Sequence, residues 1–229
     1  MRGNENITST TSDLRAVVFD LDGVLVDSEQ VWDAARRALV NELGGRWHDG
    51  ATRAMLGMSS TEWSAYIHDE LSVPLNPPEI NRAVVEHMMR AYRERLPLLP
   101  GAQAAVARMA ERWPLGLATS SNREVIKLVL ELAGLKDHFA VTVSSEEVTH
   151  GKPAPDVYLE VASRLGVRPR TAVAIEDSTN GIRAAKAAGM RVVAIPNRDF
   201  PPDPDVTSRA DLVLDDLDAL TEARLAGLG

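Results

Sequence analysis

The sequence predicts an α/β fold, with a Rossmann-like parallel sheet flanked by helices and an inserted all-helical cap domain. Past residue 97, short apolar runs alternate with segments whose apolar residues recur at helical spacing. These runs are almost continuously apolar, as is typical of strands that helices cover on both faces. Between residues 28 and 97 the sequence has helical periodicity and no comparable run, which indicates an insert made of helices alone.

The predicted strands are all short and apolar. The first covers residues 17–19 and stops at Asp20. Five more follow the insert, at residues 115–119, 140–143, 172–176, 192–195 and 211–214. Three of the helices between them end in a glycine followed by an apolar residue, namely Gly134-Leu135, Gly166-Val167 and Gly189-Met190. Because glycine readily adopts the left-handed conformation that ends a helix, this repeat favours a parallel sheet with right-handed crossovers.

The insert begins with a predicted helix that Ser28 is expected to cap, and it contains a second helix that starts at Pro77 and Pro78. No repeats and no further low-complexity tract interrupt the remainder. We therefore divide the chain into a disordered or tag-like tail (1–12), a core (13–27 and 98–229) and a helical cap (28–97).

The charge and composition of the chain exclude several classes of partner. The 229 residues carry a formal net charge of −8 and include no cysteine. Nucleic acid and anionic membranes reward clusters of Lys and Arg, so neither is expected as a partner. No apolar segment approaches the roughly 18 residues of a membrane span, and the polar N-terminus lacks the apolar stretch of a signal peptide. We expect a cytoplasmic protein that is a monomer or a weak dimer.

Polar residues follow the predicted strands at their carboxyl ends, where ligands gather in parallel sheets. They are acids, hydroxyls, an amide and one of the four lysines of the chain: Asp20 and Asp22; Thr119, Ser120, Ser121 and Asn122; Lys152; and Glu176 and Asp177. Each group alone fits a common turn or helix cap. Together they would require independent turns to present complementary groups at one edge of one sheet, which favours a single site.

The acids of this set repel one another unless a cation lies between them. Mg²⁺ is the expected cofactor, because it binds a few carboxylates together with water and a phosphate oxygen. With the cation bound, Asp20 can attack phosphorus as a nucleophile, while Asp22 carries protons for the leaving group and the attacking water. Lys152 offsets the charge of nucleophile and phosphate. The residues expected to bind phosphate are Thr119, Ser120, Asn122 and Lys152.

Four segments resemble the motifs of haloacid dehalogenase-like (HAD) hydrolases, namely DLDGVLVDS, ATSSN, GKPAPDVY and EDSTNGIRAAKAAGM. The resemblance covers residues 14 to about 215 and indicates the subgroup with a helical cap after the first motif, which includes phosphoglycolate phosphatase-like enzymes and β-phosphoglucomutases. It implies that Asp20 is the nucleophile and Asp22 the general acid/base. It also implies that Asp20, the backbone carbonyl of Asp22 and Asp177 bind Mg²⁺, with Glu176 as a direct or more distant partner.

The resemblance implies a phosphatase that acts on a small phosphomonoester through an aspartyl-phosphate intermediate. A sugar phosphate, a phosphoglycolate-like acid and a ring-bearing metabolite phosphate are all compatible with it. The mutases of the subgroup carry His where this chain has Trp32, and Arg after a Gly-x-Ser loop where this chain has Ser60 after Gly57-Met58-Ser59. Because that Arg holds a second phosphate, its absence disfavours a bisphosphate intermediate, and a phosphosugar mutase is kept only as the alternative. A catalytically idle binding protein of the same fold is a third reading, although no motif acid is lost.

Cap residues are expected to select the substrate. Trp32, Met58 and Ser59 are the candidates for contact with it, and Trp47 and Trp63 lie in the same insert. Such aromatic residues either pack the small core of the cap or line a pocket for a ring-bearing substrate. The sequence leaves both readings open.

Overall fold

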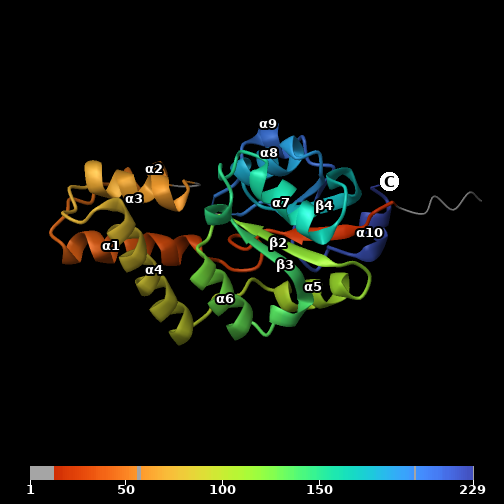
Figure 1. Ribbon diagram of the computed structural model, residues 1–229, viewed down its shortest axis with the longest axis horizontal. Coiled ribbons are helices and arrows are strands. Elements are labelled where there is room, and N and C mark those ends of the chain that lie inside the picture. Colours follow the sequence, from red (N-terminus) through yellow and green to blue (C-terminus); the bar gives the residue numbers. More distant parts are fainter. Residues whose placement is uncertain (1–12, 56–57, 199, 229) are drawn as a thin grey trace, which may run out of the picture.

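A computed structural model describes residues 13–55, 58–198 and 200–228 and consists of a sheet-containing core with a helical cap to one side (Figure 1). The predicted tail (1–12) and Gly57 lie outside the described residues. None of the helices within the described ranges combines the length and the apolar character that spanning a membrane requires.

The core contains one six-stranded sheet in the order β3-β2-β1-β4-β5-β6. Its strands are β1 (Ala16–Phe19), β2 (Leu115–Thr119), β3 (Phe139–Ser144), β4 (Ala172–Glu176), β5 (Arg191–Ala194) and β6 (Leu212–Val213). Every strand pair is parallel. The predicted fold class and all six strands are confirmed, with shifts of one or two residues at some strand ends.

The side chains of β1 alternate between two hydrophobic clusters, one on each face of the sheet. Val17 and Phe19 belong to the cluster with α5 (Ala102–Ala110), α6 (Arg123–Leu132) and α10 (Glu222–Ala226). Ala16 and Val18 belong to the cluster with the helices α7 (Asp156–Leu165), α8 (Thr179–Ala187) and α9 (Pro204–Thr207). Burial on both faces explains why the strands are apolar throughout. Short 3₁₀ helices cover Lys136–His138, Ser145–Glu147 and Pro169–Thr171.

The predicted glycine stops are present at all three helix ends. Gly134, Gly166 and Gly189 have φ values of 66°, 68° and 79°. In each case the amide of the following apolar residue bonds a carbonyl five positions earlier, as for Leu135 N–H to Leu130 O at 2.9 Å. This is the Schellman arrangement that returns the chain to the next strand.

The cap consists of α1 (Glu29–Glu42), α2 (Ala51–Met55), α3 (Ser60–Asp69) and α4 (Pro77–Glu94). The two predicted helices correspond to α1 and α4, and α4 starts at Pro77 as expected, capped by Asn76. The expected side-chain cap at Ser28 was wrong. Ser28 occupies the N-cap position, but its backbone is helical (φ −95°, ψ −20°) and its hydroxyl makes no capping bond, because side-chain capping requires an extended backbone.

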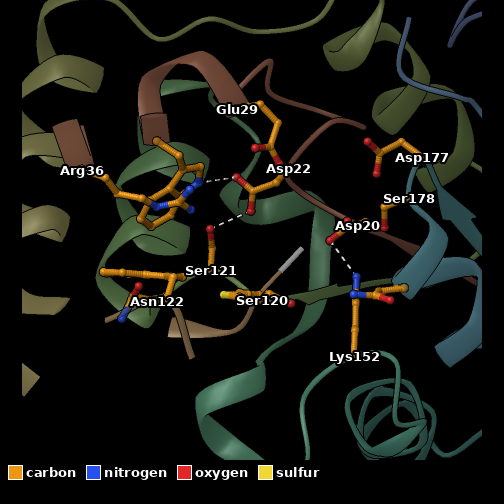
Figure 2. A pocket seen from close by; sticks show the side chains of 14 residues that line it. Asp20, Asp22, Glu29, Arg36, Ser120, Ser121, Asn122, Lys152, Asp177 and Ser178 are labelled. Carbon is orange, nitrogen blue, oxygen red and sulfur yellow. Dashed lines mark hydrogen bonds and ion pairs between the residues drawn. The ribbon is translucent and has the colours of Figure 1, made fainter. Parts of the chain in front are cut away.

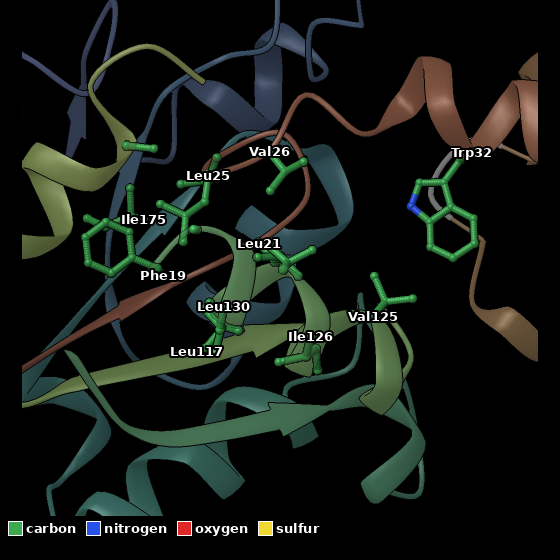
Figure 3. Close-up of a cluster of buried hydrophobic side chains, with 14 of the residues drawn as sticks. Phe19, Leu21, Leu25, Val26, Trp32, Leu117, Val125, Ile126, Leu130 and Ile175 are labelled. Carbon is green, nitrogen blue, oxygen red and sulfur yellow. The ribbon is translucent and has the colours of Figure 1, made fainter. Parts of the chain in front are cut away.

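The two segments that join the cap to the core run side by side. Asp27 donates its N–H to Pro97 O at 2.8 Å, Leu99 donates to Leu25 O at 3.0 Å, and Val26 forms an antiparallel bridge with Leu98. The outgoing segment packs on the sheet through Leu25 and Val26, and the same hydrophobic cluster continues to Trp32 in the cap (Figure 3). The cap therefore enters and leaves the core at one paired, partly apolar junction.

Candidate active site

The strand ends bring the predicted acids to one edge of the sheet. Phe19 is paired with Leu117 of β2 and Ile175 of β4, so the residues after these three positions lie next to one another. Asp20 follows β1 directly and donates its backbone N–H to Ile175 O at 3.0 Å. Because β4 ends at Glu176, the carboxylates of neighbouring strands meet where the ladder stops.

Asp20, Glu176 and Asp177 form a buried acidic group at this edge. One oxygen from each carboxylate lies within 4.8 Å of the others. Lys152 is buried beside them, with Nζ 3.0 Å from Asp20 Oδ1 (Figure 2). The same Nζ lies 2.7 Å from Glu176 Oε1. The predicted association of Lys152 with the nucleophile position is thus present in the structure.

Glu176 accepts an unusually dense set of hydrogen bonds. Oε1 accepts from Lys152 Nζ at 2.7 Å and from the hydroxyl of Tyr158 at 2.6 Å. Oε2 accepts from the backbone N–H groups of Asp177 and Ser178 and from the Ser178 hydroxyl. A Cβ at Gly181 would lie 1.8 Å from Oε1, so only glycine fits beside this carboxylate. Glu176 therefore fixes the position of Lys152.

The pKa of Asp20 is raised from 3.8 to about 8; burial is the main cause, the carboxylates of Glu176 and Asp22 add to the rise, and Lys152 opposes it. Burial also raises the pKa of Asp177 well above its usual range, and Glu176 and Asp20 add to this shift. For Lys152 burial lowers the pKa, but Asp20 and Glu176 outweigh it and the pKa is raised overall. The group is short of positive charge, because one lysine faces three acids.

The donor set of this group fits a hard divalent cation. Asp177 Oδ1 is buried without a hydrogen-bond partner among the described residues. Gly23 has φ +77°, and a Cβ there would lie 1.9 Å from Asp177 Oδ2. Glycine at this position therefore leaves room for the Asp177 carboxylate. Carboxylate oxygens are the ligands that Mg²⁺ takes in proteins. Asp20, Glu176 and Asp177 are placed where they could hold such an ion, and Asp177 has the unpaired oxygen, whereas both oxygens of Glu176 already accept hydrogen bonds.

The carboxylate of Asp22 is not part of this acidic group among the described residues. Its Oδ1 accepts from Trp32 Nε1 at 3.2 Å and its Oδ2 accepts from Ser121 Oγ at 2.6 Å (Figure 2). Oδ2 also accepts from Thr119 Oγ1 at 3.2 Å. Thr119 also accepts the N–H of Ser121. The side chain of Asp22 is thus held apart from the other acids, as a separate proton carrier would need to be.

A cavity of about 100 Å³ joins this edge of the core to the cap. From the core it is lined by acids and Lys152 together with Ser120, Ser121 and Asn122. From the cap it is lined by Glu29, Trp32, Arg36, Met58 and Trp63. Trp32 and Met58, which were predicted to contact substrate, therefore face the cavity.

Other predicted residues serve different contacts. Thr119 is fully buried and not among the lining residues of the cavity. Ser59 caps α3 in a reciprocal pair with Glu62 and does not line the cavity, since its hydroxyl is used at the helix start. The side-chain amide of Asn122 donates to Asn81 and Glu146.

Sequence reasoning missed Tyr158, Glu29 and Arg36 as site residues, and it named Ser121 among the polar residues after the strands without giving it a role. Ser121 and Tyr158 stand inside the quoted motifs, and the motif positions alone could have raised them as candidates. Glu29 and Arg36 lie three positions before and four positions after Trp32, on the same helical face. That spacing was the available signal.

Comparisons with known proteins agree with this geometry. The family model for haloacid dehalogenase-like hydrolases matches residues 14–189. Hexitol phosphatase B of Escherichia coli K12 is 36% identical over 223 residues, which covers 96% of this chain and 100% of the relative. Fructose-1-phosphate phosphatase of the same strain is 31% identical over 182 residues, which covers 78% of this chain and 95% of the relative.

A solved structure with the same fold is CbbY from Rhodobacter sphaeroides in complex with phosphate. It has a TM-score of 0.83 and 29% sequence identity, and the match covers 93% of this chain and 99% of that one. A mutant of CbbY in complex with xylulose 1,5-bisphosphate matches over the same shares, with a TM-score of 0.82 and 28% identity.

Proposed function

This chain belongs to the haloacid dehalogenase-like hydrolases and is a phosphatase of that family, and from that premise we propose a Mg²⁺-dependent hydrolysis of a small phosphomonoester through an aspartyl-phosphate at Asp20. The observation that carries the proposal is the buried arrangement of Asp20, Lys152 and Asp177 at the wall of a cavity, with Glu176 bonded to Lys152 next to them. Bound there, Mg²⁺ supplies positive charge for the nucleophile and the transferring phosphoryl group.

In the first half of the reaction, Asp20 forms a bond to phosphorus as the bond from phosphorus to the ester oxygen breaks. Asp22 gives a proton to the departing alkoxide, so the alcohol leaves neutral. Hydrogen bonds from Trp32, Thr119 and Ser121 hold the Asp22 carboxyl group in a fixed orientation for this proton transfer. Lys152 neutralises charge beside Asp20, which electrostatic catalysis of phosphoryl transfer requires.

In the second half, a water molecule attacks the aspartyl-phosphate. Asp22 takes the proton of that water, the bond between phosphorus and the Asp20 oxygen breaks, and inorganic phosphate leaves with Asp20 restored. Asp22 ends the cycle protonated, ready for the next ester. Protons and phosphoryl groups therefore balance over one turnover.

The relatives favour a sugar or sugar-alcohol phosphate as the substrate, since two of them are named for hexitol and fructose-1-phosphate hydrolysis. Phosphoglycolate-like and ring-bearing esters are the other small monoesters in the proposal.

We also propose that residues 28–97 open and close on the core of residues 13–27 and 98–229 about the paired junction at Asp27 and Pro97.

Phosphate release tests the proposal directly. The full-length protein is assayed on a panel of sugar, polyol and aryl phosphates with Mg²⁺ and with EDTA, beside the Asp20→Asn variant. We expect release only with the cation, loss of release in the variant, and a phosphorylated peptide containing Asp20 in the acid-quenched wild type. Release at the wild-type rate by Asp20→Asn would contradict the nucleophile assignment. A requirement for a bisphosphate activator, with isomerised product, would favour the mutase instead.

A further inference from the structure

Arg36 is a buried cation at the cap side of the cavity. It is 6% exposed, and its guanidinium carbon lies 5.4 Å from the ring centroid of Trp32 and 5.3 Å from that of Trp63. Its Nε is buried without a hydrogen-bond partner in the described part of the chain. Burying a guanidinium with an unpaired donor is costly. Because Nε itself is closed off, a partner from outside the chain would bind the part of the side chain that lines the cavity.

The position of Arg36 points to the part of the substrate that carries no phosphate. In Figure 2, Arg36 and Lys152 lie at opposite ends of the pocket, with Asp22 between them. Phosphate transfer takes place beside Asp20 and Lys152, so a group near Arg36 belongs to the leaving alcohol. Arginine offers only donors, and the atom that it binds must therefore be an acceptor.

Carboxyl groups near Arg36 limit what that acceptor can be. Glu29 lines the same cavity and, among the acids around the guanidinium, has the largest electrostatic effect on Arg36, followed by Asp33 and Asp22. A carboxylate or second phosphate placed against Arg36 would also lie in the field of these acids. A hydroxyl group avoids this cost, because it can accept from Arg36 and donate to Glu29 at once.

The two tryptophans give a second limit. One face of each ring is turned toward the Arg36 guanidinium, and the rings also contact one another with centroids 6.0 Å apart. The faces that Arg36 covers are not open for stacking on an aromatic substrate, and both indoles are buried, at 7% and 3% exposed, so little of their other faces is open either. This argues against the ring-bearing ester and for a slender, hydroxylated one.

We propose that Arg36 and Glu29 bind hydroxyl groups of the leaving alcohol and thereby select neutral polyol or sugar monophosphates over esters with a second anionic group. This inference rests on the proposed phosphatase function and narrows its substrate class. The proposed selectivity differs from that of a protein that binds bisphosphates, such as CbbY in its complex with xylulose 1,5-bisphosphate.

The test compares three esters on the full-length protein with Mg²⁺: glucitol 6-phosphate, 6-phosphogluconate and ethyl phosphate. The first two differ in a terminal carboxylate, and ethyl phosphate lacks hydroxyls. We expect wild-type kcat/KM to be at least about tenfold higher for glucitol 6-phosphate than for either of the others. In Arg36→Met the ratio of glucitol 6-phosphate to ethyl phosphate falls about 10- to 100-fold, as loss of a charged hydrogen bond predicts.

Matched variants separate binding from folding. Arg37→Met alters the neighbouring exposed arginine, which stacks on Trp47 and pairs with Asp33 outside the cavity, and it should keep the substrate ratio. Arg36→Lys keeps a cation and a long stem but loses the planar fork, so its ratio should fall between those of wild type and Arg36→Met. Glu29→Gln should lower the same ratio and raise relative activity on 6-phosphogluconate.

Each remaining outcome counts against the inference. If Arg36→Met lowers kcat/KM equally for glucitol 6-phosphate and ethyl phosphate, Arg36 is structural and the inference falls while the phosphatase stands. If wild type prefers 6-phosphogluconate or xylulose 1,5-bisphosphate and Arg36→Met loses that preference, Arg36 binds an anionic group of the substrate and the inference is wrong. Absence of release from every ester would overturn the proposed function and this inference with it.

Discussion

The indole nitrogen of Trp32 donates a 3.2 Å hydrogen bond to Asp22 Oδ1 and so joins the first helix of the cap to the carboxylate that we propose as the acid/base. The same carboxyl group accepts from Ser121 at 2.6 Å on its other oxygen. Asp22 is therefore oriented from both sides of the cavity, once by the cap and once by the core. In the proposed mechanism, closure of the cap and orientation of Asp22 are linked through the side chain of Trp32.

Replacing Trp32 with Phe removes that donor and keeps most of the ring. We expect kcat to fall about 3- to 10-fold, the range of one neutral hydrogen bond of roughly 0.5–1.5 kcal/mol. The unfolding midpoint in denaturant should change little. Trp63→Phe is the control, since Trp63 lines the cavity but is not among the residues that donate to Asp22 in the described part of the chain. Equal losses in kcat for both variants would show that packing, and not the hydrogen bond, is responsible.

Replacing Gly23 with Ala should abolish tight binding of Mg²⁺. The added Cβ would lie 1.9 Å from Asp177 Oδ2, so the carboxylate must leave its position. The expected readout is loss of the rise in unfolding temperature on addition of Mg²⁺. Gly134→Ala is the matched control: its φ is also positive, at +66°, but nothing lies within 4 Å of the new Cβ. This control should lose about 1–2 kcal/mol of stability through backbone strain and still respond to Mg²⁺.

Metal-free protein should lose stability as the pH rises from about 6 to 8. The pKa of Asp20 is about 8 in the folded state against 3.8 as its ordinary value, so between these values the folded state binds a proton that the unfolded state has lost. The free energy of unfolding then falls by up to about 1.4 kcal/mol per pH unit and levels off above the folded pKa. Urea unfolding in EDTA measures the slope.

Asp20→Asn is the control for that slope. Because the amide does not titrate, the variant's free energy of unfolding should fall less between about pH 6 and 8. Mg²⁺ should restore most of the stability at pH 8, where the ionised carboxylates bind it best. A metal-free protein that is equally stable at both pH values, or more stable at the higher one, would contradict the raised pKa of Asp20.

Replacing Lys152 with Met should be more damaging than replacing any surface lysine. The change leaves Asp20 and Glu176 buried without their cation, and breaking such a pair costs about 3–5 kcal/mol. We expect a lower unfolding midpoint and loss of phosphate release. Lys186→Met, which removes the partly exposed pair with Asp211, should cost at most about 1 kcal/mol and keep activity.

The strands and the motif acids could be predicted because both follow from local patterns. A strand buried on both faces must be apolar throughout, and a parallel sheet gathers its strand ends at one edge, so Asp20, Thr119 and Glu176 were identified without coordinates. The side-chain cap expected at Ser28 failed because the chain enters α1 already helical. A backbone conformation at a domain junction depends on contacts that no local pattern encodes.

What the sequence by itself determined about this protein is the fold class, the helical insert and the chemistry at the sheet edge, since each depends on residue type and spacing. Only the tertiary structure decided which side chains of the insert face the acids. Trp32, Trp63 and Arg36 come together from α1 and α3, whereas Ser59 is used to start a helix. The reason is physical: the direction of a helical side chain follows from periodicity, but the element it meets depends on how the helices of the cap pack on one another and on the core.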